Sequence, residues 1–181
     1  LFPGHDTPAM KQAFKDLDDR TAQFEAMRDL LAPEIAADDF LKFLRLLEEN
    51  TRLASRVSQY AGLWFSEDTA NQHATTFQAR VQQMMAELQN RTMFFSLWWK
   101  ALDEENAARL LESAGEFRYY LTQLRNFKPY TLTEPEEKII NIKDVTGASA
   151  LQTLYAALTN RYSFKIEVDG ESKELTRGEL M

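Results

Sequence analysis

The sequence predicts a mainly α-helical fold, a multi-helix antiparallel bundle that is followed by one C-terminal β-hairpin. The 181 residues include only 5 prolines and 6 glycines, and several of these lie together at residues 3–4, 129–135 and 170–178. The stretches between them contain few residues that interrupt a helix. Within those stretches apolar residues recur at spacings of three and four, the period of a helix with a buried face. Only residues 162–168 alternate apolar and polar side chains as a strand does.

Two long helices are predicted in the first third of the chain. Apolar residues from Phe14 to Leu31 form one stripe on a helix that we expect to run from Pro8 to just before Pro33. Asp38 then has the position of an N-cap, a residue whose side chain accepts a hydrogen bond from a free backbone N–H. Residues 40–64 carry two neighbouring apolar stripes, so we expect this helix to be buried on about half of its girth.

The middle of the chain is predicted to hold one long helix and two short ones. The long helix is expected to begin near Asp68 and to run through Leu102, with a break near Asn90. Asp103 is the expected N-cap of the next helix, and short helices are predicted near residues 104–113 and 116–127. The pattern stops at Lys128, because a residue that precedes proline is disfavoured in the helical conformation.

Two capping boxes predict the helices that follow. Thr133 precedes Glu136, and Ser149 precedes Gln152, by three residues. At this spacing the two side chains satisfy each other's free backbone N–H groups at the start of a helix. Gly147 lies between the boxes and is typical of a helix end. We therefore expect helices near residues 134–146 and 149–160.

The alternating segment predicts a β-hairpin. Its apolar residues lie at every second position, and Asp169-Gly170 supplies the tight turn into a return strand over Glu171–Leu175. An isolated hairpin is only marginally stable, so we expect its apolar face to pack against a helix. The apolar residues of the first strand are Tyr162, Phe164, Ile166 and Val168.

A third capping box follows the hairpin at Thr176 and Glu179, and only Leu180 and Met181 remain for the helix that it opens. Because the first turn is the unfavourable nucleation step of a helix, we expect this helix to be truncated. The predicted division of the chain is a helical lobe over residues 1–160, and a hairpin with the start of a truncated helix over residues 161–181.

Composition excludes several classes of function. The formal charge of −7 has the wrong sign for a protein that binds nucleic acid through its phosphates. The sequence has no cysteine, which excludes disulfides, thiolate zinc sites and cysteine nucleophiles, and is typical of a reducing compartment. No stretch of this sequence has the length of apolar residues that a membrane span needs. We therefore expect a cytoplasmic protein with neither nucleic acid nor membrane as a partner.

The sequence also lacks the usual patterns of catalysis. His5 and His73 have no neighbouring ligand at helical spacing, so they are interpreted as surface histidines. There is no glycine-rich phosphate loop and no G-x-S-x-G motif. Adjacent carboxylates on a helix point about 100° apart, so the paired acids are interpreted as solvated faces and not as an acid and base. These pairs are Asp18-Asp19, Glu48-Glu49, Glu104-Glu105 and Glu136-Glu137.

Two aromatic segments allow alternative interpretations. The run Met93–Trp99 covers every side of its helix, which favours a core or an interface over a pocket for a hydrophobic ligand. Arg118–Tyr120 resembles an exposed recognition patch. The favoured alternative is a tyrosine pair between helices whose hydroxyl groups reach water.

Five short segments occur in a characteristic order before the hairpin: Leu17–Thr21, Asp68–Gln72, Phe94–Trp99, Lys128–Lys138 and Lys143–Gly147. In this order the chain resembles the N-terminal part of oligoendopeptidase F, a family of zinc metallopeptidases related to thimet oligopeptidase. The resemblance extends to Leu180, and residues 128–138 with Gly147 and the hairpin are its most specific part. Many relatives have His where this chain has Tyr130, a position that is not a zinc ligand in the family.

The resemblance implies that the intact protein is a cytoplasmic zinc endopeptidase for short peptides, whose two helical lobes enclose a deep cleft. This chain would be the N-terminal lobe. In the family two histidines of an H-E-x-x-H motif bind zinc, its Glu polarises the attacking water, and a later Glu completes the ligands. The motif does not occur in this sequence, so no catalytic, cofactor-binding or metal-ligating residue is assigned to it.

The resemblance places the zinc in a missing catalytic domain, to which the truncated helix would lead. The partners that it implies for the lobe are its own C-terminal catalytic domain and short peptide substrates. The lobe is expected to roof the cleft and to restrict access to unfolded peptides. Apolar residues that contact the missing domain would then be exposed here, and the chain alone is expected to self-associate weakly. The candidates are Tyr155, Leu158, Leu180, Met181 and parts of Trp98-Trp99.

Two other functions remain open. One is a free-standing helical module that binds a partner protein or helix, which should end on a completed element of structure. The other is a carrier for a hydrophobic small molecule in a pocket beside Trp98-Trp99, which requires a closed cavity.

Overall fold

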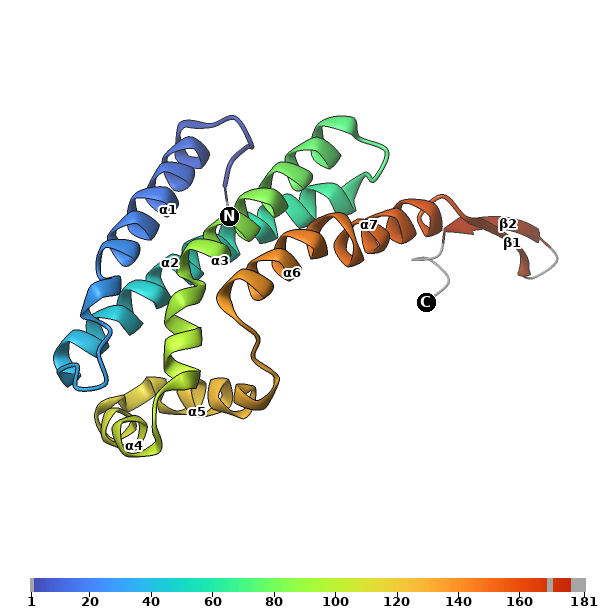
Figure 1. Cartoon of the computed structure of the whole chain (residues 1–181). Helices are drawn as coiled ribbons and strands as arrows, with labels where there is room; N and C mark the ends of the chain where they lie inside the picture. Colours follow the sequence, from blue (N-terminus) through green and yellow to red (C-terminus); the bar gives the residue numbers. More distant parts are fainter. Residues whose placement is uncertain (1, 169–170, 177–181) are drawn as a thin grey trace.

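The computed structural model describes residues 2–168 and 171–176, and within them the chain is mainly α-helical with one two-stranded sheet (Figure 1). The predicted fold class is confirmed. Short 3-10 helices follow α1, α4 and α5, at Arg28–Leu30 (η1), Gly115–Phe117 (η2) and Lys128–Tyr130 (η3). The helices and strands are α1 (Pro8–Ala26), α2 (Ala37–Glu67), α3 (Gln72–Ala101), α4 (Glu104–Ser113), α5 (Arg118–Asn126), α6 (Glu134–Thr146), α7 (Ala148–Thr159), β1 (Ser163–Val168) and β2 (Glu171–Thr176).

The three long helices α1, α2 and α3 pack side by side and bury two apolar clusters, and α6 packs against α3 (Figure 1). The first cluster joins the beginnings of α1 and α3 to the end of α2, around Met10, Leu17, Val57, Phe77 and Val81. The second joins the other ends of these helices to α4 and α5, around Phe24, Phe40, Phe95, Trp99 and Leu110. No helix of the described part has the length and apolar composition that crossing a membrane requires.

The aromatic run Met93–Trp99 belongs to the second cluster. Met93, Phe94, Phe95 and Trp99 are buried, which supports the interpretation as core. Trp99 is fully buried, so the expectation that it contributes to an exposed patch is wrong. Burying its indole N–H requires an acceptor, and the N–H donates to the backbone oxygen of Leu121 in α5 at 2.9 Å. Trp98 beside it is only partly buried.

Helix α3 continues without interruption through Asn90, so the expected break is wrong. The Asn90 side chain accepts a hydrogen bond from Asn141 Nδ2 of α6 at 2.7 Å. The same nitrogen donates to the backbone oxygen of Ala86 at 2.8 Å. Asn90 therefore joins α3 to α6 and does not compete with the backbone of its own helix.

Several helix ends agree with the sequence. Asp103 accepts a hydrogen bond from the backbone N–H of Asn106 at 2.9 Å and caps α4. Thr133 and Glu136 form the predicted capping box of α6, in which the backbone N–H of Thr133 donates to the Glu136 carboxylate at 2.9 Å. Asn71, at the end of the loop before α3, caps that helix through its side chain.

Other ends differ from the predictions. Helix α2 begins at Ala37 with Ala36 as N-cap, so Asp38 lies in the first turn, where a carboxylate is favourable beside the positive helix end. Helix α7 begins at Ala148 after Gly147, and Ser149 does not cap it. Helix α1 ends at Ala26, not just before Pro33. The chain from Leu31 onward turns toward α4, where it buries Ile35 in the core.

The hairpin is confirmed, but its predicted packing against a helix is wrong. Strands β1 and β2 are antiparallel, with Phe164 opposite Leu175 and Ile166 opposite Lys173. Phe164 and Tyr162 are exposed, and the hairpin projects beyond the end of α7 (Figure 1). Its apolar side chains therefore have no helix to cover them within the described part. The predicted turn at Asp169-Gly170 and the helix after Thr176 lie outside the described residues.

Gly147 joins α6 to α7 at a point with no room for a side chain. Its backbone N–H donates to the oxygen of Lys143 at 2.8 Å, and a Cβ at residue 147 would lie 2.8 Å from that same oxygen. Real Cβ atoms essentially never approach an atom so closely. The junction between the two helices therefore depends on glycine.

We expect Gly147→Ala to loosen α7, because the backbone must shift to relieve the contact, at a cost of about 1–3 kcal/mol. Amide hydrogen exchange in α7 should accelerate. Gly62→Ala is the matched control, because a Cβ there meets nothing within 4 Å. It should stabilise α2 by about 0.5–1 kcal/mol. Equal exchange in α7 for the wild-type and Gly147→Ala chains would contradict the assignment.

Candidate functional site

Both histidines are exposed at the surface. His5 is exposed at one face of its ring while the other stacks on Trp64, with ring centroids 4.4 Å apart. His73 is exposed in the first turn of α3. Among the described residues no three His, Asp or Glu side chains form a group that can hold a metal ion. The absence of catalytic and metal-binding residues from this chain stays a prediction of the sequence.

The paired acids form ion pairs and caps in the structure. Arg91 of α3 binds Asp18 and Glu25 of α1 at 2.5 and 2.6 Å, and the hydrogen bond to Glu25 is the main reason why the pKa of Arg91 is raised. Glu104 binds Arg125 of α5, which lowers the pKa of its carboxyl group. Glu136 belongs to the capping box of α6, and its hydrogen bonds to Thr133 lower its pKa. These carboxylates are largely exposed, as the sequence predicts, and bind neighbouring side chains and a helix end.

A pocket of about 500 Å³ lies where the end of α3 meets η1 and the segment between α5 and α6. We call it the cationic pocket. Two of the segments that carry the family resemblance, Phe94–Trp99 and Lys128–Lys138, come together in it. The sequence did not predict this, because the segments are separated by all of α4 and α5. The lining residues are Arg28, Phe94, Leu97, Trp98, Lys100, Ala101, Lys128, Thr131, Leu132 and Glu134.

The charges of the cationic pocket are only partly compensated. Glu134 binds Arg28 at 2.8 Å and Lys138 at 2.7 Å, and these hydrogen bonds, the one from Lys138 first, lower the pKa of its carboxyl group. Lys128 lies 3.5 Å from Glu104, a long contact for an ion pair. Lys100 makes no ion pair or hydrogen bond through its side chain with the described residues. Lys100 lines this pocket and also a neighbouring hollow that contains Glu137, while Lys128 has only long contacts at this pocket.

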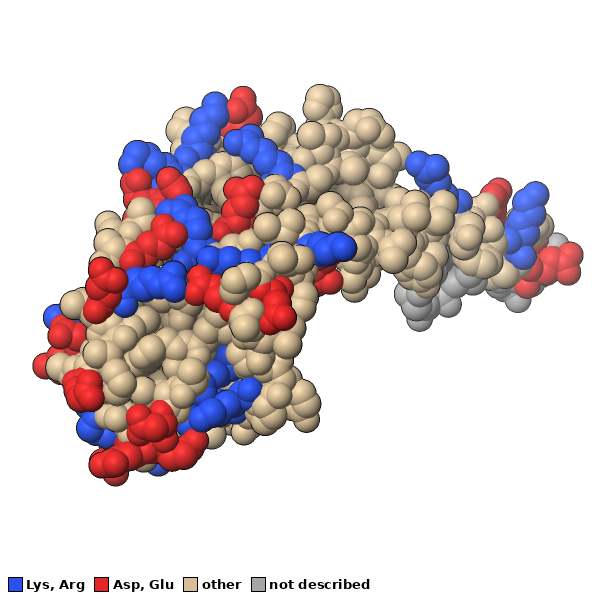
Figure 2. Space-filling model, viewed as in Figure 1, with Lys and Arg blue, Asp and Glu red and all other residues tan. Residues whose placement is uncertain are grey.

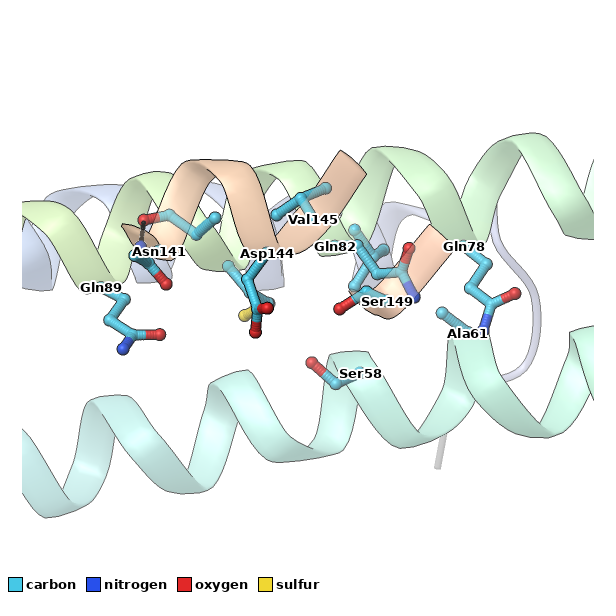
Figure 3. A pocket seen from close by; sticks show the side chains of 12 residues that line it. Ser58, Ala61, Gln78, Gln82, Gln89, Asn141, Asp144, Val145 and Ser149 are labelled. Atoms are coloured by element: carbon cyan, nitrogen blue, oxygen red, sulfur yellow. Dashed lines mark hydrogen bonds between the residues drawn. The ribbon is translucent and has the colours of Figure 1, made fainter. Parts of the chain in front are cut away.

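A second hollow, the polar groove, lies between α2 on one side and α6 and α7 on the other, with α3 behind it (Figure 3). Its volume is about 330 Å³. Figure 3 shows Ser58 of α2 pointing into the space that Asp144 and Ser149 approach from the other side. The Oε1 atom of Gln78 is buried, and none of the described residues donates a hydrogen bond to it. Half of the residues that line the groove carry an amide or hydroxyl group, and none of them is lysine or arginine.

Helices α6 and α7 carry a large exposed apolar surface, which we call the apolar face. Neither helix has a fully buried residue, and α7 packs chiefly on α6. Tyr155 is 61% and Leu158 is 49% exposed, as the sequence predicts, whereas Leu180 and Met181 lie outside the described residues. Figure 2 shows few charged side chains along α6 and α7. The face comprises Ile139, Ile140, Ile142, Leu151, Leu154, Tyr155 and Leu158, and continues to Tyr162 and Phe164.

The tyrosines of Arg118–Tyr120 do not form the pair between helices that the sequence favours. Tyr119 is 76% exposed. Leu121 is fully buried, and Tyr119, two residues earlier, lies about 200° around the helix on the solvent side. Tyr120 is half-exposed over a small apolar pocket of about 280 Å³ with Leu47 and Phe117, and partial burial raises the pKa of its hydroxyl group.

Two comparisons with known proteins found a similarity, one in sequence and one in fold. The family model described as Oligopeptidase F matches residues 98–164. Among solved structures, the crystal structure of oligoendopeptidase-F from Enterococcus faecium superposes with a TM-score of 0.75 at 19% sequence identity. The match covers 94% of this chain and 33% of that one. No curated protein matches the sequence.

Both comparisons agree with the resemblance that the sequence indicates. This chain resembles the N-terminal lobe of oligoendopeptidase F in sequence over residues 98–164 and in fold over nearly its whole length. It spans about a third of the length of the Enterococcus faecium protein. Most lining residues of the cationic pocket, and all of α6 and α7, lie in the segment that matches the family model.

We expect the isolated chain to self-associate weakly through the apolar face, because exposed apolar surface of this extent is reburied by association. The double substitution Leu154→Gln and Leu158→Gln should raise the dissociation constant about tenfold or more. Tyr119→Gln is the control, because Tyr119 is exposed on α5, away from α7 (Figure 1). Sedimentation velocity over a range of concentrations measures the effect. A wild-type chain that stays monomeric at high concentration contradicts it.

Proposed function

We propose that this chain is the non-catalytic N-terminal lobe of a zinc-dependent oligoendopeptidase that hydrolyses short peptides. The match of residues 98–164 to the Oligopeptidase F family supports a peptidase parent. The similar fold extends over 94% of this chain but only 33% of the oligoendopeptidase-F chain. The remaining length of that protein has no counterpart in this sequence, which leaves room for a separate catalytic domain.

The observation that carries the proposal is the apolar face of α6 and α7. Helix α7 packs chiefly on α6. Its residues Leu151, Leu154 and Leu158 are each exposed over roughly half or more of their surface, so within the described part α7 lacks a partner for this side. Exposed apolar side chains that recur along one helix in this way are typical of an interface. In the proposed function the face packs against the catalytic domain of the same polypeptide.

The catalytic domain would supply the chemistry. It would carry the H-E-x-x-H helix, bind the zinc ion and activate the attacking water. The helical lobe would roof the cleft between the two domains, so that only short or unfolded peptides reach the metal. A cysteine-free sequence is typical of a reducing compartment, so we place the enzyme in the cytoplasm.

The alternative is a free-standing helical module that binds a partner protein. Two observations favour this alternative: Tyr119 is exposed, and so is the apolar face. Exposed aromatic and apolar side chains are common where a protein binds a partner. The coding sequence after residue 181 distinguishes the two functions. An H-E-x-x-H motif in the same reading frame supports the lobe, and a stop codon directly after Met181 supports the module.

We expect the purified 181-residue chain to retain less than stoichiometric zinc after dialysis and to leave peptides uncleaved. The reason is that the sequence has no cysteine, two separated histidines and no H-E-x-x-H motif. Metal analysis by atomic emission and an assay with internally quenched peptides measure both properties. One zinc per chain, held by protein ligands, contradicts the assignment of the metal to another domain. The oligoendopeptidase-F from Enterococcus faecium is the positive control.

A further inference from the structure

We propose that the cationic pocket binds the C-terminal carboxylate of a short peptide and the apolar side chain of its last residue. The lobe would then hold one end of the substrate. The choice of a peptide as ligand rests on the proposed function, whereas the choice of a carboxylate rests on the residues of the pocket.

The charge of the pocket selects an anion. Three cationic side chains and one carboxylate line it, in a chain whose formal charge is −7. Arg28 and Glu134 compensate each other. Lys100 has no ion pair with the described residues and Lys128 has only the long contact with Glu104, so both can donate hydrogen bonds to a ligand. Charge-assisted bonds from ammonium to carboxylate are among the strongest available.

Lys128 is held in place without being neutralised. Its ammonium group lies 3.4 Å from the backbone oxygen of Leu102 and 3.5 Å from Glu104. Glu104 is mainly engaged by Arg125, which also donates to the Leu102 oxygen at 3.0 Å. The ammonium group is therefore positioned at the pocket by weak contacts, and a ligand carboxylate can offer it a closer acceptor.

The apolar lining selects an anion that carries an apolar group. Trp98 and Leu97 are partly buried and Leu132 is 48% exposed, so all three present apolar surface at the pocket. Phe94 contributes less, because it is buried and the Arg28 guanidinium lies 5.0 Å from its ring centroid. A bare phosphate gains nothing from this surface. The last residue of a peptide offers both groups, because its carboxylate and its side chain are bonded to the same Cα atom.

The size of the pocket agrees with this ligand, and two of the other hollows fit a carboxylate less well. A volume of about 500 Å³ lies in the range of small-molecule sites, about 300–1,000 Å³. The polar groove has Asp144 and no lysine or arginine among its lining residues, so it would repel a carboxylate. The pocket at Tyr120 is smaller, and its single arginine, Arg52, is accompanied by Glu48.

The test is a titration of the 181-residue chain with N-acetyl-alanyl-phenylalanine, followed by calorimetry and by amide shifts in NMR spectra. The matching peptide amide, which lacks the carboxylate, should bind at least about tenfold more weakly. Binding should also weaken as salt is raised, because the ammonium groups are partly exposed to solvent. Inorganic phosphate at the same concentration should not compete.

Lys100→Gln tests the pocket directly. It should weaken binding of the acid about tenfold and leave binding of the amide unchanged, because it removes a donor to the carboxylate only. Lys143→Gln is the matched control: it removes the same charge from an exposed position of α6 outside the pocket and should change affinity less than about twofold. Circular dichroism confirms that both variants are folded.

Equal binding of the acid and the amide, an unchanged affinity in Lys100→Gln, or full competition by phosphate would each overturn the inference. None of these results bears on the zinc content or on the downstream coding sequence, which test the proposed function. A stop codon directly after Met181 would contradict the proposed function. It would not change the affinity of the pocket for a carboxylate.

Discussion

The arrangement of this lobe depends on how the end of α3 is anchored to α5. The indole of Trp99 is fully buried and donates to the backbone oxygen of Leu121 at 2.9 Å. Arg125, one turn later in α5, donates to the backbone oxygens of Trp99 and Leu102 at 2.9 and 3.0 Å. The last carbonyl groups of a helix lack partners within the helix, and an arginine satisfies both their hydrogen bonds and their partial charge. The same guanidinium lies 5.6 Å from the centroid of the Trp99 ring.

This anchor determines the course of the chain that follows. With α5 held across the end of α3, the segment 127–133 returns the chain to α3, and α6 then packs along it (Figure 1). Arg28 and Glu134 fix the start of α6 to η1, and Asn141 fixes its middle to Ala86 and Asn90. Beyond Gly147 no comparable contact holds α7 within the described part of the chain, so its apolar residues stay exposed. The apolar face is thus a consequence of where these polar contacts end.

The periodic part of this structure could be predicted from the sequence, and the parts that depend on distant residues could not. The helices from α1 to α7 follow apolar spacing, and the cap at Asp103 and the box at Thr133 follow local hydrogen bonding. Asp38 and Ser149 were misassigned as caps because a polar residue is equally favourable in the first turn, one or two residues later. The hairpin was correctly predicted from alternation, but alternation does not say whether a helix lies beside it.

The cationic pocket could not be predicted from the sequence either, because it is formed by residues that are distant in sequence. Arg28 meets Glu134 across 106 positions of sequence, and no periodicity links them. The aromatic run and the segment Lys128–Lys138 could be recognised separately, but only the fold shows that they line one hollow. A signal was nevertheless present, because Lys100 and Lys128 flank two helix ends in an otherwise acidic chain.

The positions of the apolar face and the cationic pocket are related through α6. Glu134 in the first turn of α6 lines the pocket, while Ile139, Ile140 and Ile142 further along the same helix belong to the apolar face. Under the proposed function, packing of that face against a catalytic domain would therefore place the pocket at the margin of the interface between the two lobes. A peptide held by its carboxylate at this margin would extend between the lobes, where the zinc ion of the second domain would be expected. The same helix would then both join the domains and orient the substrate between them.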